Sequence, residues 1–179
     1  MNFKHETRKI ALESLNGIKA INAKIEKLKS EKLKYSDSFY NQELKKLTDE
    51  KNGIIVTGKA KVEKMADEYR AKIHSDFQLK GEELTEDAAL FSSAISISHR
   101  QLEELAEKHK NNNTMLQMIY QYAERNQVPL GKHGKTESER LAFVDSMVNY
   151  YKSVTGRPEY SDIWEDDNHF ETAFGSDEK

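Results

Sequence analysis

Apolar residues recur at spacings of three and four along the first part of the chain. Ile18, Ile21, Ile25 and Leu28 lie between lysines and glutamates, and no proline interrupts residues 5–35. Such spacing places apolar side chains on one stripe of a helix, which suits pairing with a second helix. The pattern therefore predicts a helical seam about two heptads long.

A second helix is predicted from about residue 38 to residue 78, after the small polar residues Ser36, Asp37 and Ser38. Such residues favour turns and helix caps over helix interiors. Within the second helix, glycines flank the apolar residues 54–56, and the apolar spacing lengthens in a way that locally unwinds a left-handed supercoil. We expect residues 53–58 to be the weakest point of this stalk.

The two long segments can be arranged in two ways, and the sequence leaves both open. If Ser36 to Ser38 form a turn, the helices fold back as an antiparallel hairpin about 45 to 60 Å long. If the helix continues, the result is a rod of about 110 Å. The hairpin is slightly favoured because one chain can then bury its own seam, whereas a continuous rod would need an oligomer.

The long period ends near Gly81, and four shorter helices are predicted after it. They cover residues 85–91, 98–110, 114–126 and 136–156, with Thr85, Ser98, Thr114 and Thr136 as N-caps. Residues 129–135 contain several turn formers and are predicted to be a loop. Gly156 and Pro158 are expected to end the last helix.

These elements predict an all-α protein in three parts. Long coiled-coil helices occupy residues 1–80, a small helical domain occupies 81–156, and an acidic, aromatic-containing tail occupies 157–179. Composition agrees, because only 36% of residues are hydrophobic, 33% are charged and the mean hydropathy is −0.86. That leaves too little apolar material for one globular core, whereas a paired helix needs only a narrow seam.

The formal net charge of −3 hides a strong asymmetry along the chain. Residues 1–80 hold 18 basic and 12 acidic side chains, whereas residues 81–179 hold 10 basic and 19 acidic ones. Such polarity can align molecules head to tail or steer a basic partner to the acidic end. Solvated helix faces and a disordered acidic tail would give the same pattern.

No motif in the sequence predicts catalysis or a bound cofactor. The chain has no cysteine, its six histidines form no metal-binding pair, and neither a nucleophile elbow nor a phosphate-binding glycine loop is present. The N-terminal lysines alternate with glutamates and lack interleaved aromatics, so we expect no nucleic-acid partner. No segment is apolar enough for a signal peptide or a membrane span, which predicts a soluble intracellular protein with no membrane partner.

Three short motifs suggest a family. They are leucine-threonine-x-aspartate-alanine at 84–88, asparagine-x-threonine-methionine at 112–115 and tyrosine-alanine-glutamate at 122–124. Together with the charged helices before them, they resemble small helical proteins from the virion-structure region of tailed phages and prophages of Gram-positive bacteria. The resemblance covers about residues 60–128 and implies a capsid-assembly role, with a scaffolding-type protein as the first candidate. Residues 128–179 are an addition to that pattern.

The resulting hypothesis is a non-enzymatic, homo-oligomeric phage protein that contacts a capsid or other virion protein, in the host cytoplasm or within the virion or procapsid. The predicted oligomerisation seam consists of Ile18, Ile21, Ile25, Leu28, Leu44, Leu47, Val62 and Met65. The predicted partner-binding residues are Met115, Met118, Tyr122, Trp164, Phe170 and Phe174. The alternative is a phage-encoded inhibitor of a host protein that uses its acidic C-terminal region. No metal, cofactor or catalytic residue is expected.

Overall fold

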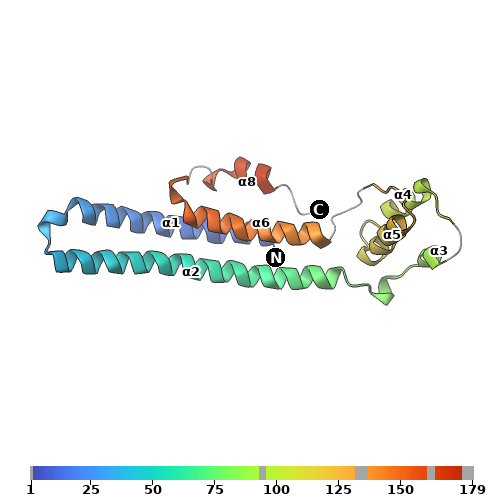
Figure 1. Cartoon of the computed structure of the whole chain (residues 1–179), viewed down its shortest axis with the longest axis horizontal. Coiled ribbons are helices and arrows are strands. Elements are labelled where there is room, and N and C mark those ends of the chain that lie inside the picture. The colour runs from blue at the N-terminus through green and yellow to red at the C-terminus, as the bar shows by residue number, and fades with distance from the viewer. Residues whose placement is uncertain (1, 93–95, 132–136, 161–163, 175–179) are drawn as a thin grey trace. The chain divides into compact units, whose positions relative to one another are not determined.

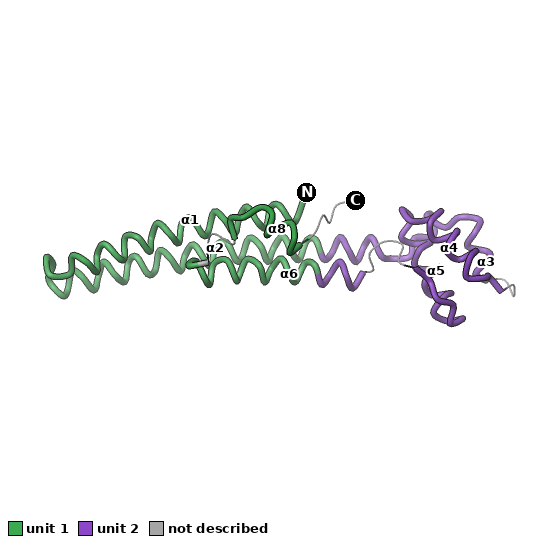
Figure 2. The backbone as a smooth tube through the Cα atoms, turned by 90° about the horizontal axis from the view of Figure 1, so that it is seen from above, with its two compact units in different colours: residues 1–69, 143–179 green, residues 70–142 purple. Residues whose placement is uncertain are grey.

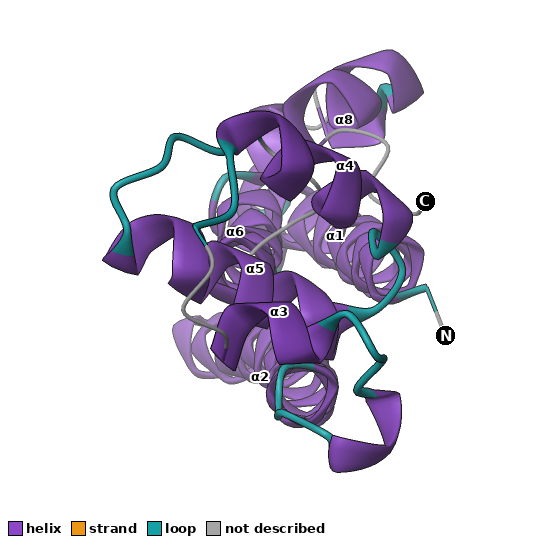
Figure 3. Cartoon of the chain, turned by 90° about the vertical axis from the view of Figure 1, so that its right-hand side faces the viewer, coloured by secondary structure: helices purple, strands orange, loops and turns teal. Residues whose placement is uncertain are grey.

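A computed structural model describes residues 2–92, 96–131, 137–160 and 164–174. Every regular element in these ranges is helical and none is a strand, which confirms the predicted all-α class (Figure 3). The α-helices are α1 (Phe3–Ser30), α2 (Asp37–Asp76), α3 (Ala88–Ser92), α4 (His99–Lys108), α5 (Asn113–Arg125), α6 (Glu137–Gly156) and α8 (Asp167–Phe174). Three short 3-10 turns, Lys32–Lys34, Gly81–Glu83 and Pro158–Tyr160, lie between them.

Helices α1 and α2 form an antiparallel hairpin, the arrangement that the sequence favoured over a rod (Figure 1). The side chain of Asn2 accepts from the backbone N–H of His5 and caps α1. At the turn, Ser36 Oγ accepts from the backbone N–H of Phe39 at 3.3 Å, so the predicted polar hinge supplies the cap of α2. Farther along, Lys51 Nζ donates to Asn22 Oδ1 at 3.0 Å across the hairpin.

The chain divides into two compact units whose boundaries fall inside α2 and α6 (Figure 2). Unit 1 comprises residues 1–69 and 143–179, and unit 2 comprises residues 70–142. This division differs from the predicted parts, because most of α6 packs with the hairpin instead of with the short helices. The apolar stripe of α6 explains the difference, since a narrow seam needs another helix to bury it.

Unit 1 has a core made by three helices. Its least exposed apolar side chains are Ala11, Leu15 and Ile18 of α1, Val62 and Ala66 of α2, and Val144, Met147 and Val154 of α6, each at most 1% exposed. Full burial of such a side chain stabilises a fold by about 1.5 to 3 kcal/mol for the larger ones. A third helix therefore supplies the burial that two helices alone lack.

Residues 53–58 do not interrupt α2, which is a continuous helix through both glycines. The expectation of a weak point rested on the cost of glycine inside a helix. Gly58 compensates by allowing close packing, because it is buried beneath the Tyr151 side chain of α6.

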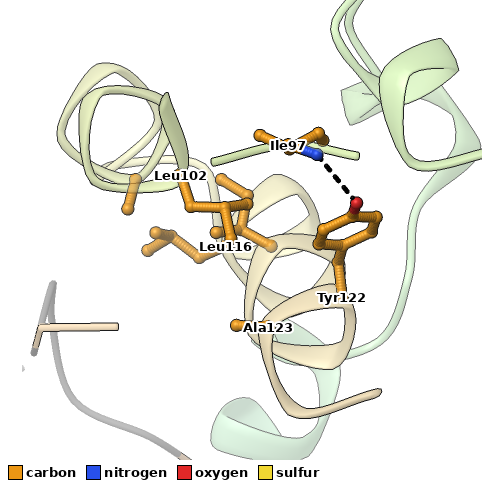
Figure 4. Close-up of a cluster of buried hydrophobic side chains, with 7 residues drawn as sticks. Ile97, Leu102, Leu116, Tyr122 and Ala123 are labelled. Atoms are coloured by element: carbon orange, nitrogen blue, oxygen red, sulfur yellow. Dashed lines mark hydrogen bonds between the residues drawn. The ribbon is translucent and has the colours of Figure 1, made fainter. Parts of the chain in front are cut away.

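Unit 2 has a core of its own, drawn from α4, α5 and the segment before α4 (Figure 4). Its buried residues are Ile97, Leu102, Ala106, Leu116, Ile119, Tyr122 and Ala123. The Tyr122 hydroxyl accepts from the backbone N–H of Ile97 at 3.0 Å, and it thereby ties the extended segment to α5. Buried backbone groups need such partners.

The predicted caps of unit 2 are partly right. Ser98 caps α4 and forms a reciprocal capping box with Gln101. The cap of α5 is Asn112, whose side chain accepts from the backbone N–H of Met115, so the prediction of Thr114 was wrong. Thr114 lies inside the helix and donates to Glu83 Oε2 at 2.8 Å. The predicted cap Thr136 lies outside the described residues. The short helix expected over 85–91 appears as α3, but it begins only at Ala88, after a turn at residues 86–87, so Thr85 does not directly precede it.

Candidate functional site

An open groove lies between α1 and α2 in unit 1. It encloses about 520 Å³ and is lined by Ile10, Glu13, Ser14 and Ile21 from α1 and by Glu50, Gly53, Ile54, Thr57, Gly58 and Lys61 from α2. All of these lining residues belong to the two long helices, and none belongs to α6. The groove is therefore a surface that the hairpin makes by itself.

Glycines lie in or near this groove, among them Gly53 in its lining and Gly17 next to the lining residue Ile54. Gly53 has no neighbouring atom within 4 Å of the position that a Cβ would take. A Cβ on Gly17 would lie 3.0 Å from Ile54 Cδ1, so the glycine lets that isoleucine pack close to α1. Absent side chains at such positions allow helical backbones to approach closely.

Gly58 allows a polar contact that joins the three helices of unit 1. The Tyr151 hydroxyl of α6 lies against Gly58 and 3.0 Å from the carbonyl oxygen of Ile55 on α2, to which it donates. It also lies 3.3 Å from Ser14 Oγ on α1. Burial raises the pKa of the Tyr151 hydroxyl, so the group is a neutral donor at physiological pH.

Opposite charges lie along the α2 side of the groove. Glu50 and Lys61 are exposed, and they are eleven positions apart. Eleven residues are close to three helical turns, so both side chains project from the same face of α2. Neither has an ion-pair partner among the residues that the structure describes.

A second cluster in unit 1 joins α8 and the residues just before it to α1. Lys4 Nζ donates to Glu171 Oε2 at 2.8 Å, Lys19 Nζ donates to Glu165 Oε1 at 2.6 Å, and Arg8 pairs with the Asp167 carboxylate. The Lys4 hydrogen bond lowers the pKa of the Glu171 carboxyl. Acidic residues of the C-terminal segment are therefore neutralised by basic residues near the N-terminus of the same chain.

Phe170 anchors this C-terminal segment. Its side chain is 2% exposed, and its ring lies 5.1 Å from that of Tyr150 and 5.2 Å from that of Phe174. The Arg8 guanidinium lies 4.6 Å from the centre of the Phe170 ring, and cations so placed are attracted to an aromatic face. Trp164 packs edge-on against Tyr150 at 5.9 Å.

The predicted oligomerisation seam divides into two groups. Ile18, Ile21, Leu28 and Val62 are buried within the chain. Ile25, Leu44, Leu47 and Met65 are half-buried and keep part of their apolar surface exposed. The structure brings both groups onto one hairpin, and their role in oligomerisation stays a prediction.

The predicted partner-binding residues are distributed over both units. Met115 and Tyr122 pack inside unit 2, and Phe170 packs inside unit 1, so burial gives these three a structural role in the single chain. Met118, Trp164 and Phe174 are half-buried. A common binding surface made of all six is not formed in either unit.

The polar residues in unit 2 include one close acid–base contact. His109 Nε2 and Lys108 Nζ lie 2.7 and 2.6 Å from Asp87 Oδ2. These interactions, the one with Lys108 first, lower the pKa of the Asp87 carboxyl. They fasten the turn before α3 to the end of α4.

Sequence reasoning missed the contact among Ser14, Gly58 and Tyr151, and it missed the charges of the groove. The glycine at position 58 is evident in the sequence, but nothing in the sequence indicates which distant side chain it accommodates.

In the described part of the chain, no cluster of three potential metal ligands and no helix able to span a membrane is found.

Comparison with known proteins finds no relative for this arrangement. The chain matches no protein-family model, no curated protein and no solved structure.

Proposed function

We propose that this chain is a non-enzymatic helical protein that associates with copies of itself and acts through protein contacts in phage virion or capsid assembly, in the manner of a scaffolding protein. The observation that carries the proposal is the groove between α1 and α2. Its lining includes the apolar side chains Ile10 and Ile54, and the two opposite charges on its α2 side, Glu50 and Lys61, have no ion-pair partner in the described part of the chain. A surface of this kind suits a further helix, and it gains its burial only when that helix is present.

The distal part of the hairpin supports association as well. Ile25, Leu44 and Leu47 lie where α1 and α2 approach the turn, and each remains only half-buried. Two helices bury a narrow seam incompletely, whereas a bundle of four covers it on every side. We therefore propose that the coiled-coil character expected from the sequence is completed between copies.

The phage assignment rests on the sequence resemblance over residues 60–128. Its three motifs lie in the turn that leads into α3, at the beginning of α5 and near the end of α5, all inside unit 2. Unit 2 would then present the contact to the coat or another virion protein, while unit 1 supplies association.

The contacts of the C-terminal segment favour this function over an inhibitor that uses a free acidic region. Glu165, Asp167 and Glu171 are each paired with a basic side chain of α1. Acidic groups that are already neutralised have less charge to offer to a basic partner.

Sedimentation velocity tests the association, at protein concentrations from about 1 µM to about 200 µM, which cover moderate and weak affinities. Concentration-dependent dimers or larger species are expected. A monomer over the whole range contradicts the proposal.

The assembly role needs a separate experiment. The chain should be expressed together with the coat protein of the same genome, and the particles should be counted by electron microscopy. We expect closed shells of uniform size only when the chain is present. Equal shells with and without it would contradict the scaffolding role.

A further inference from the structure

We infer that the groove between α1 and α2 receives helix α2 of a second copy, in an antiparallel arrangement about a twofold axis. The inference rests on the self-association proposed above and adds its geometry. Identical patches face each other in a twofold interface, so that residue i contacts residue j and residue j contacts residue i. Four of the lining residues of α2, Glu50, Ile54, Thr57 and Lys61, satisfy this condition.

The twofold axis crosses the helix midway between Ile55 and Val56. About that point, Glu50 lies opposite the partner's Lys61, and Ile54 lies opposite the partner's Thr57. Each pair has one member on either side of the axis at equal distance along the helix. The segment between Gly53 and Gly58 is therefore centred on the same point of the sequence as the pair Glu50 and Lys61.

Charge selects the antiparallel orientation. A parallel pair would place Glu50 against the partner's Glu50 and Lys61 against the partner's Lys61, which is repulsive at both positions. The antiparallel pair forms two Glu–Lys contacts, about 16 Å apart along the helix. Glu50 and Lys61 are exposed and form no ion pair among the described residues, and Glu13 of α1 adds a third charge to the same groove.

Shape supports the same occupant. The absence of a side chain at Gly53 leaves open space along the groove, and small residues at a helix crossing let the two backbones come close. Ile10 and Ile21 line the groove on α1, and Ile54 lines it on α2. Ile10 and Ile54 are half-buried, so an incoming α2 would cover them and remove their remaining exposed apolar surface from water.

Charge reversal tests the pairing directly. Glu50→Lys and Lys61→Glu should each weaken dimerisation by about tenfold or more, because two attractive contacts become repulsive. The combined variant Glu50→Lys/Lys61→Glu should restore the dimer. Matched controls are Lys59→Glu and Glu63→Lys, which change charge on another face of the same helix and should leave the dimer affinity within about twofold.

Mixing the two single variants provides the sharpest measurement. In an antiparallel mixed dimer, the lysine introduced at position 50 of one copy faces the glutamate introduced at position 61 of the other. At the second contact, the native Lys61 of the first copy faces the native Glu50 of the second. Both contacts are then attractive, so equimolar mixing should restore the affinity that each variant lacks alone, as measured by sedimentation velocity.

A cross-linking experiment locates the axis. The chain has no cysteine, so Thr57→Cys introduces a single thiol next to the proposed axis. A short bismaleimide should link two copies of this variant efficiently, whereas Lys59→Cys, on another face of α2, should remain largely unlinked.

The outcomes separate this inference from the proposed function. A wild-type chain that stays monomeric contradicts both. A dimer that tolerates both single reversals, or that is not restored by mixing them, contradicts the antiparallel docking and leaves self-association intact. Equal cross-linking at positions 57 and 59 also contradicts it.

Discussion

At the scale of single residues, Gly58 has the most specific role that the structure reveals. The Tyr151 hydroxyl occupies the space beside it, and Ser14 Oγ lies 2.6 Å from the position of a Cβ at residue 58. A glycine in a helix interior costs about 1 kcal/mol relative to alanine. The close contact of Tyr151 with Gly58 and Ser14, which joins three helices, offsets this loss of helix stability at position 58.

We predict that Gly58→Ala destabilises the protein by about 1 to 3 kcal/mol, because the new methyl group displaces Tyr151 and breaks its hydrogen bonds. Urea unfolding measures the change. Gly53→Ala is the matched control, since it adds a methyl group to open space in the same helix. At concentrations where the chain is monomeric, it should stabilise by up to about 1 kcal/mol.

The variant Tyr151→Phe tests whether the Tyr151 hydroxyl causes the loss of stability in Gly58→Ala. If the hydroxyl is the group that clashes, Gly58→Ala should cost less in a Tyr151→Phe background than in the wild type. An equal cost in both backgrounds would contradict this explanation.

Asp87 provides a residue-scale prediction of pH dependence. Its carboxyl pKa is lowered in the folded chain, chiefly by Lys108, so its contribution is fully present above the unfolded pKa of about 3.9. That contribution is lost as the pH falls through the lower, folded pKa. At about pH 5, Asp87→Asn should therefore be less stable than the wild type by about 1 to 2 kcal/mol.

Unfolding free energies measured from about pH 5 to about pH 2.5, a range that spans the carboxyl pKa, check this difference. The gap between the wild type and Asp87→Asn should shrink toward the acidic end. Asp49→Asn is the control, because Asp49 is exposed on α2 and has no ion-pair partner among the described residues. A gap that persists unchanged at the lowest pH would contradict the assigned role.

At the scale of elements, α8 is a short helix that tertiary contacts hold in place. Its eight residues are too few for a stable isolated helix. The buried ring of Phe170 and the ion pairs with α1 supply the missing stability. Through Phe170, α8 covers part of Tyr150 on α6 and of Arg8 on α1.

We predict that Phe170→Ala releases the C-terminal segment while the three-helix core of unit 1 stays folded. Trp164 is the only tryptophan, and it contacts the Tyr150 ring, so its fluorescence reports the release. Its emission should shift to longer wavelength and become more accessible to acrylamide. The far-ultraviolet dichroism should change by little more than one short helix.

His169→Ala is the control on the same helix, because His169 is exposed. It should leave the Trp164 emission unchanged. If Phe170→Ala also leaves the emission unchanged, Phe170 does not anchor the segment.

At the scale of the whole molecule, the basic and acidic regions of the chain form ion pairs that the sequence could not specify. The basic N-terminal and acidic C-terminal regions meet inside unit 1, where Lys4, Arg8 and Lys19 pair with acids of residues 165–171. The polarity along the chain therefore acts partly within one molecule. The proposed dimer would use the two charges that α2 contributes to the groove, Glu50 and Lys61, for its external contact.

Self-association predicts that thermal stability depends on protein concentration. Binding that requires the folded chain raises the apparent midpoint as concentration increases. Differential scanning fluorimetry should show a higher midpoint at higher concentration for the wild type. Glu50→Lys should lose that dependence while its midpoint at the lowest concentration stays near that of the wild type. A midpoint independent of concentration in the wild type would contradict dimerisation.

The sequence by itself determined the helical class, the two long helices and the turn between them. These features depend on local chemistry: apolar spacing along α1, the capping hydroxyl of Ser36, and the absence of proline from the long helices. The start of α4 at Ser98 is local in the same way. Asn112 was missed as a cap because several adjacent polar residues could each have served.

Only the tertiary structure decided which helix covers which seam. The apolar stripe of α6 fits any complementary stripe, and its packing on the hairpin depends on distant contacts such as that between Tyr151 and Gly58. The same holds for Phe170, because the acidic residues near it in the sequence do not indicate whether its side chain is exposed or buried. Local sequence sets the helices, whereas burial and close approach between residues far apart in the chain set their partners.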